Sequence, residues 1–135
     1  MGTYCEIQLY VASRIGARIM VRRMIDEVNR LESKYTRYRE DSFLSKINRS
    51  AGDQTGIKID VETLKLFEHA QTCYEQSDGL FDITAGVLRR VWDFSRKRIP
   101  DESELQETLP LIGYERLHWH DDMLFLPEGM EIDFG

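Results

Sequence analysis

A glycine turn that leads directly into an apolar segment constrains the fold of this chain more than any other sequence feature. The turn dipeptide is Asp78-Gly79, and glycine tolerates the positive φ that such turns often need. Asp82 follows where a new helix could begin, beside backbone N–H groups without a partner inside the helix. We therefore predict a helix over roughly Thr84–Trp92, preceded by a turn that could hold a phosphate or another polar ligand group.

Length and composition are typical of one globular domain. The chain has 135 residues, of which 41% are hydrophobic and 31% charged, enough for a real core. A net charge of −6 argues against non-specific binding to nucleic acid, because polyanions need a basic surface. The sequence predicts no transmembrane segment and no secretory signal. Cys5 and Cys73 lack the CxxC spacing of a zinc site; buried thiols are favoured, and one disulfide remains the alternative.

Hydrophobic periodicity predicts helices and strands without a regular βαβ rhythm, so we expect an α+β fold rather than a doubly wound sheet. Residues Thr3–Val11 alternate and are rich in β-formers, which indicates a strand. Ser13 can cap the long amphipathic helix that follows, whose apolar stripe we expect to pack in the core. Further expected elements are a short helix after Asp41 or Ser42, a strand at Ile57–Ile59, a long helix capped by Asp60, a short helix starting with Asp101 and Glu104, a hairpin around Asp121-Asp122, and a strand at Glu131–Phe134.

No classical catalytic motif is present, but three segments are candidates for ligand contacts. Tyr38-Arg39 offers a ring that can stack on a flavin or adenine and a guanidinium that can pair with phosphate, although the residues alone favour a capped loop with a surface tyrosine. The Leu80–Asp82 segment offers backbone N–H groups and a carboxylate; its alternative is a capped helix with Leu80 and Phe81 buried. Asp133 lies between apolar residues, where a carboxylate should be paired or bound unless it faces outward by alternation.

In combination, these segments make the chain resemble the ApbE family, the FAD:protein FMN transferases. The similarity extends along the whole sequence in the family's order. It is carried by Met1-Gly2-Thr3, by YREDSFLSKIN at Tyr38–Asn48, by SDGLFDITAGVL at Ser77–Leu88 with Trp92 and Phe94, by LIGY at Leu111–Tyr114, and by EIDFG at Glu131–Gly135. Several long blocks in register are more specific than a single short motif.

The resemblance implies an enzyme that binds FAD, uses Mg²⁺, cleaves the FAD pyrophosphate and attaches FMN to a Thr or Ser hydroxyl of a target protein, releasing AMP. Magnesium suits this chemistry because it bridges phosphate oxygens and neutralises charge in the transition state. The implied acceptors are subunits of Nqr-type Na⁺-pumping or Rnf-type redox complexes. Carried over by position, the FAD contacts would be Met1, Tyr38, Leu80, Phe81, Asp82 and Asp133. No catalytic residue and no metal ligand is assigned.

The sequence departs from the family pattern at Val87, where proline is usual, and at Phe134, where leucine is usual. The family domain continues past Gly135 with a lysine and a metal-binding region. We therefore expect residues 1–135 to be the N-terminal part of an ApbE-like domain that lacks the magnesium site and cannot transfer FMN alone. The alternative is a non-catalytic flavin-binding or protein-interaction module from a truncated gene product. The compartment stays open, because family members are often lipoproteins and this chain has no lipobox.

Overall fold

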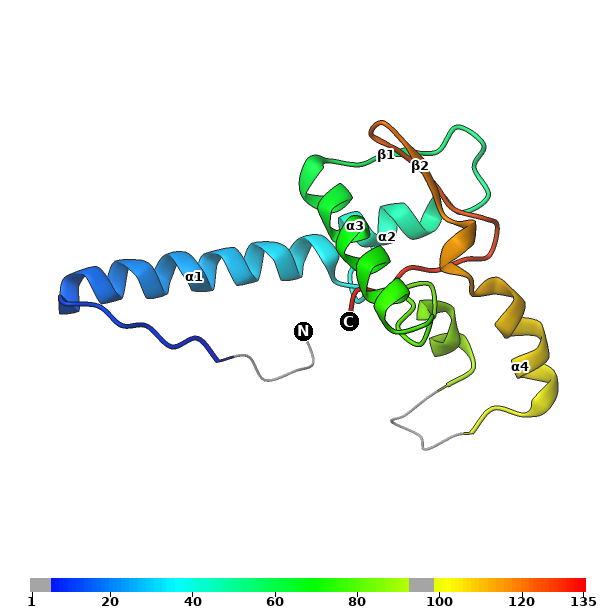
Figure 1. The fold of residues 1–135 in the computed structure, drawn as a ribbon, viewed down its shortest axis with the longest axis horizontal. Coiled ribbons are helices and arrows are strands. Elements are labelled where there is room, and N and C mark those ends of the chain that lie inside the picture. Colours follow the sequence, from blue (N-terminus) through cyan, green and yellow to red (C-terminus); the bar gives the residue numbers. More distant parts are fainter. Residues whose placement is uncertain (1–5, 93–98) are drawn as a thin grey trace. The chain divides into compact units, whose positions relative to one another are not determined.

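The computed structural model describes residues 6–92 and 99–135, and these described residues fall into two compact units that divide between Ser45 and Lys46. We call them the N-terminal unit and the C-terminal unit (Figure 1). Helices and a small antiparallel sheet are mixed along the chain, so the α+β prediction is confirmed. Within the described residues, no helix combines the length and the hydrophobicity needed to cross a membrane.

The N-terminal unit is dominated by helix α1, Arg14–Tyr35, drawn in blue to cyan in Figure 1. The Ser13 hydroxyl accepts a hydrogen bond from the Gly16 N–H at 3.3 Å, so the predicted cap is confirmed. No residue of α1 is buried, and Ile15 is 75% exposed. The expectation that this stripe packs in a core is therefore wrong, because periodicity reports an amphipathic helix and not what covers it.

The strand predicted for Thr3–Val11 is wrong over its described part, because residues 6–11 have no regular secondary structure. Residues 3–5 lie outside the described residues, as does Cys5. Alternating β-formers favour a strand only where a neighbouring strand pairs with their backbone groups. No such pairing is recorded for residues 6–11.

The sheet of the C-terminal unit has three short antiparallel strands in the order β1-β3-β2. These are β1 (Ile57–Lys58), β2 (His118–His120) and β3 (Met123–Phe125). Strands β2 and β3 form the predicted hairpin, and Asp121 at its tip has a φ of 55°. Opposite charges also link β1 to the turn of this hairpin, because the Lys58 ammonium lies 2.7 Å from the Asp122 carboxylate.

Helix α3, Val61–Gln76, supplies the centre of the core in the C-terminal unit. The Asp60 carboxylate accepts a hydrogen bond from the Thr63 N–H at 2.9 Å, which confirms its predicted capping role. Phe67 of α3 is fully buried, and its ring meets Trp119 at 6.1 Å and Phe134 at 5.4 Å between centroids. The buried apolar side chains of this unit also include Ile47, Ile59, Ala70, Ile83, Val87, Tyr114, Leu117, Leu124, Leu126, Met130 and Ile132.

The rest of the C-terminal unit consists of short helices and a paired terminal segment. Helix α4, Glu102–Thr108, carries the predicted capping box between Asp101 and Glu104. The 3₁₀ helices are η1 (Gly86–Arg90), η2 (Leu109–Leu111) and η3 (Tyr114–Arg116). Cys73 is a free, half-buried thiol.

Two predicted elements near the candidate site are wrong. The helix expected over Thr84–Trp92 is the shorter 3₁₀ helix η1, because residues 82–85 form a turn instead of a first helical turn. The strand expected over Glu131–Phe134 is reduced to one parallel bridge between Ala85 and Glu131. A bridge of this kind forms between a turn and a terminal segment, and it leaves no periodic signal in the sequence.

Candidate functional site

The turn after α3 presents two apolar side chains to solvent. Leu80 is 92% exposed and Phe81 is 46% exposed, so the alternative in which both are buried is wrong. The backbone beneath them is fixed, because the Ser77 hydroxyl accepts from the Phe81 N–H at 2.9 Å and the Gly79 N–H donates to the Tyr74 carbonyl at 2.9 Å. Exposed apolar side chains on a hydrogen-bonded turn are suited to contact a ligand or partner.

Gly79 and Asp78 make this turn possible. Both have positive φ, 80° for Gly79 and 52° for Asp78, which is the left-handed region that glycine tolerates best. The glycine turn predicted from the sequence is therefore confirmed. A side chain added at Gly79 would lie 3.5 Å from the Tyr74 ring, so the backbone conformation rather than crowding explains the glycine.

Asp82 closes the turn with its carboxylate instead of starting a helix. Its Oδ1 accepts from the N–H and from the hydroxyl of Thr84, both at 2.7 Å. Its Oδ2 accepts from the Tyr114 N–H at 3.2 Å. The predicted helix N-terminus at Asp82 is therefore wrong, because a short aspartate side chain satisfies the backbone two residues ahead and favours a turn.

Asp133 lies beside this turn in the C-terminal unit. Its N–H donates to the Ile83 carbonyl at 2.8 Å, one residue after Asp82. Asp133 is half-buried as a residue, and its carboxylate accepts from the Gly135 N–H at 3.1 Å in an exposed hydrogen bond within its own segment. The structure thus brings Asp133 to the same part of the C-terminal unit as the Leu80–Asp82 turn.

Tyr38 belongs to the N-terminal unit, and Met1 lies outside the described residues. The Tyr38 side chain is 78% exposed, and its hydroxyl accepts from the Arg37 guanidinium at 2.9 Å. The Arg37 guanidinium also lies 5.0 Å from the centre of the Tyr38 ring. An exposed ring next to a cation is a possible platform for a planar anionic ligand.

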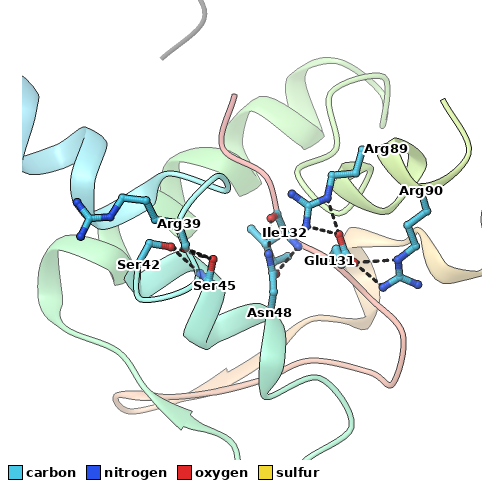
Figure 2. A network of polar contacts seen from close by, with 8 residues as sticks. All are labelled: Arg39, Ser42, Ser45, Asn48, Arg89, Arg90, Glu131 and Ile132. Atoms are coloured by element: carbon cyan, nitrogen blue, oxygen red, sulfur yellow. Dashed lines mark hydrogen bonds and ion pairs between the residues drawn. The ribbon is translucent and has the colours of Figure 1, made fainter. Parts of the chain in front are cut away.

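Arg39, the candidate phosphate partner, is paired within its own loop. Its guanidinium donates to both oxygens of Asp41, at 3.0 Å and 2.7 Å, and this hydrogen bonding raises the pKa of Arg39. The loop continues into α2, Phe43–Arg49, through hydroxyl groups: Ser42 donates to Ser45, and Ser45 donates to the Arg39 carbonyl (Figure 2). Ser42 also caps α2, as predicted, because its hydroxyl accepts from the Ser45 N–H at 3.0 Å.

A cluster around the terminal segment was not predicted from the sequence. Arg89 and Arg90 of η1 both pair with the Glu131 carboxylate, at 2.8 Å and 2.6 Å (Figure 2). The Asn48 side chain hydrogen-bonds the backbone of Ile132 at 2.9 Å and 2.7 Å. These residues are far apart in the sequence. The only sequence signal for them is that Asn48 and Glu131 lie in the YREDSFLSKIN and EIDFG blocks, which resemble the ApbE family.

Tyr114 links the candidate site to the core. Its hydroxyl donates to the Phe67 carbonyl at 2.7 Å, and its ring stacks on Tyr74 with centroids 5.1 Å apart. Burial raises the pKa of Tyr114 to about 12, with smaller contributions from the charges of Asp82 and Glu75. The phenol therefore stays protonated and acts as a hydrogen-bond donor that holds η3 to α3.

A hollow of about 550 Å³ lies elsewhere in the C-terminal unit. It is lined by Gly52, Asp53, Gln54, Glu115, Arg116, His118, Phe125, Leu126 and Pro127. None of the predicted FAD contacts in the described residues lines it. Two guanidinium nitrogens of Arg116, Nε and Nη2, are buried there without a hydrogen-bond partner. Because these atoms have almost no accessible surface, a ligand could reach them only if the side chain moved.

The described residues do not fit a metal site. Over residues 6–92 and 99–135, no group of three or more His, Cys, Asp or Glu side chains is placed to hold an ion. The carboxylates of Asp82 and Asp133 both already accept hydrogen bonds from backbone N–H groups. No chemical step is therefore assigned to a metal held by these residues.

The chain is similar to proteins of one family over its whole length. The sequence model of the ApbE family matches residues 1–135. The FAD:protein FMN transferase of Buchnera aphidicola is 26% identical over 122 residues, covering 87% of this chain and 35% of that protein. The FAD:protein FMN transferase of Vibrio cholerae is 28% identical over 125 residues, covering 87% of this chain and 36% of that protein.

Solved structures give the same result for the fold. The ApbE protein from Thermotoga maritima superposes with a TM-score of 0.81 at 26% identity, covering 91% of this chain and 41% of that one. The apo form of the Pseudomonas stutzeri flavinyl transferase ApbE gives a TM-score of 0.75 at 21% identity, which supports the fold alone. This chain thus spans 41% of the first of these structures and 35% of the Buchnera relative.

Proposed function

The chain belongs to the ApbE family, and from this premise we propose that it forms part of an FAD:protein FMN transferase. The name comes from relatives of which this chain covers 35% and 36%, so the activity is proposed for the complete family domain. We propose residues 1–135 as the N-terminal part of that domain. Within it, their role is to bind and orient FAD.

The exposure of Leu80 and Phe81 on a fixed turn carries this proposal. Isoalloxazine and adenine are planar and largely apolar, so an exposed phenyl ring and a leucine can cover one of their faces. Asp82 and Asp133, which lie close to this turn, would accept hydrogen bonds from ring N–H or ribose hydroxyl groups. Tyr38 and Met1 complete the proposed set of FAD contacts.

The proposed reaction transfers FMN from FAD to a hydroxyl group of a target protein. The oxygen of a Thr or Ser side chain attacks the phosphorus of the FMN half, the pyrophosphate P–O bond breaks, the hydroxyl proton is released, and AMP leaves with the bridging oxygen. We propose Mg²⁺ as the metal, because it neutralises phosphate charge in such transfers. We propose that the Mg²⁺ ligands lie in the part of the family domain that follows residues 1–135 in the longer relatives. A subunit of an Nqr- or Rnf-type redox complex is the proposed acceptor.

Titration with FAD tests the binding role. Flavin fluorescence should change in a saturable way when the chain is added, and Phe81→Ala should weaken binding by about three- to tenfold, as expected for a lost stacking contact. Val61→Ala is the matched control, because Val61 is a 69% exposed apolar residue on α3 outside the proposed surface. Equal affinities for wild type and Phe81→Ala would contradict the assignment of this turn.

Transfer is tested separately from binding. The complete domain should attach flavin to an acceptor protein, read as a fluorescent band under denaturing conditions. If the complete domain binds FAD and leaves every acceptor unlabelled, the transferase role is wrong, and a non-catalytic flavin-binding module is the better description.

A further inference from the structure

Asn48 holds the backbone of the terminal segment in the manner of a neighbouring strand. Its side-chain Nδ2 donates to the Ile132 carbonyl at 2.9 Å, and its Oδ1 accepts from the Ile132 N–H at 2.7 Å (Figure 2). The two bonds fix the orientation of the amide, because the N–H of Ile132 requires an oxygen and the carbonyl requires an N–H donor. A side-chain amide here copies the pairing of a peptide group across a β-ladder.

The other edge of the same segment is paired with the turn after α3. The Asp133 N–H donates to the Ile83 carbonyl, and Ala85 forms a bridge with Glu131. Close approach is possible because Gly86 has no side chain: a Cβ there would lie 2.9 Å from the Glu131 carbonyl oxygen and 3.0 Å from the Asp133 Cβ. Residues 131–133 are therefore held between Asn48 on one side and residues 83–86 on the other.

Burial makes this arrangement strict. Ile132 is 1% exposed, so leaving its backbone N–H and carbonyl groups without hydrogen-bond partners would destabilise the folded chain. Glu131 and Asp133 both approach η1, because Glu131 pairs with Arg89 and Arg90 and the Asp133 Cβ would lie 3.0 Å from a Cβ at Gly86. The two arginines that hold Glu131 then fix the rotation of the segment about its own axis.

We propose that Asn48 is a positioning residue, which acts through the backbone of Ile132 to hold the Asp133 carboxylate where it contacts FAD. The FAD contact of Asp133 rests on the proposed function, whereas the hold on Ile132 does not. Both hydrogen bonds of the Asn48 side chain go to the backbone of Ile132, so in this proposal Asn48 acts through that backbone.

The first experiment measures the hold without any ligand. Amide exchange of the 135-residue chain, read by NMR, should show a protected Ile132 N–H, and Asn48→Ala should speed its exchange by at least about tenfold while the amides of α3 keep their rates. Asn29→Ala is the matched control, because Asn29 is an exposed asparagine on α1. An unchanged Ile132 rate in Asn48→Ala would overturn the proposal.

The second experiment asks whether the hold acts through Asp133. FAD affinity and thermal midpoint are measured for wild type, Asn48→Ala, Asp133→Ala and the double variant. Each single change should weaken FAD binding by about three- to tenfold, and Asn48→Ala should have no further effect on affinity in the Asp133→Ala background, although it still lowers the midpoint there. Multiplicative losses of affinity would mean that Asn48 acts by another route, which would overturn the positioning role.

The two experiments separate the proposals from each other. One outcome is that the wild-type chain fails to bind FAD while Asn48→Ala still speeds exchange of the Ile132 amide. The proposed FAD site and the positioning role of Asn48 are then both wrong, although Asn48 does hold the Ile132 backbone. If FAD binds and the Ile132 amide is unaffected by Asn48→Ala, the positioning role alone is wrong.

Discussion

The Asp82 carboxylate accepts a hydrogen bond from the backbone N–H of Tyr114, 3.2 Å away, and this contact ties the turn after α3 to η3. The other oxygen of the same carboxylate holds the N–H and hydroxyl of Thr84. Asp82 is therefore part of the framework of the C-terminal unit as well as a proposed FAD contact. A substitution there changes stability and binding together.

Asp82→Ala should lower the free energy of unfolding by roughly 2–4 kcal/mol, because it leaves the Thr84 and Tyr114 donors without an acceptor. Asp82→Asn should cost less, since its amide oxygen can still accept from Thr84. Urea unfolding measures both, with the exposed Asp26→Ala on α1 as the control. A loss no larger than that of the control would show that the recorded hydrogen bonds do not hold the turn.

Tyr114 should make the chain less stable in alkaline solution. Burial raises the pKa of its phenol to about 12, above the value of 10.0 for an unperturbed tyrosine. The unfolded chain therefore loses this proton first as pH rises. The contribution of this group is complete below about pH 10 and falls between about pH 10 and pH 12 by roughly 2–3 kcal/mol.

Tyr114→Phe tests this dependence. The variant keeps the ring stacked on Tyr74 but loses the bond to the Phe67 carbonyl, so it should be about 1 kcal/mol less stable near neutral pH and should lack part of the alkaline fall. Unfolding free energies measured from about pH 8 to about pH 12 give the comparison. Tyr10→Phe, at a 94% exposed position, should follow wild type. Identical alkaline slopes for Tyr114→Phe and wild type would refute the assignment.

Gly86→Ala and Gly16→Ala should have opposite effects on stability. A Cβ at Gly86 would lie 2.9 Å from the Glu131 carbonyl oxygen, so we expect a loss of roughly 1–3 kcal/mol. A Cβ at Gly16 meets nothing closer than 3.9 Å and lies in α1, where alanine should gain about 0.5–1 kcal/mol. Thermal unfolding of the two variants decides the point, and a neutral Gly86→Ala would mean that the terminal segment does not lie against η1.

Glu131→Gln should weaken the link between η1 and the terminal segment. The Glu131 side chain is 15% exposed and the two arginine side chains are 42% and 43% exposed, so the pairs are partly screened and the loss should be about 1 kcal/mol. The difference from wild type should shrink as salt is added, since screening weakens what the variant has lost. Glu68→Gln, at an exposed position on α3, is the control. A salt-independent difference would argue against an ionic contribution.

Local signals predicted much of the fold correctly. The predicted caps are confirmed for four helices, at Ser13, Ser42, Asp60 and the Asp101–Glu104 box. A short polar side chain before a helix accepts a hydrogen bond from a backbone N–H of the first helical turn, so this signal is local in the sequence. The hairpin at Asp121-Asp122 follows from the same kind of local chemistry. The irregular order of helices and strands predicted the α+β class, and the ApbE protein from Thermotoga maritima, which the family resemblance pointed to, shares the fold.

Non-local contacts account for what the sequence did not predict. The apolar stripe of α1 forms a helix as predicted, yet the stripe carries no information on what lies against it. The Asn48–Ile132 pair joins residues 84 positions apart through a side chain and a backbone, and such pairs have no period. Asp82 was predicted as a helix start, because an aspartate shortly after a glycine turn looks the same in the sequence whether it caps a helix or closes a turn.

NMR titration of the 135-residue chain with FAD tests the central claim most directly. The account predicts saturable shifts in the amides of residues 80–82 and 133, with smaller changes at Tyr38, and unchanged amides around the hollow lined by Gly52 and Arg116. Shifts confined to the hollow, or no saturable shift at all, would contradict the proposal that the Leu80–Asp82 turn and Asp133 form the FAD-binding surface.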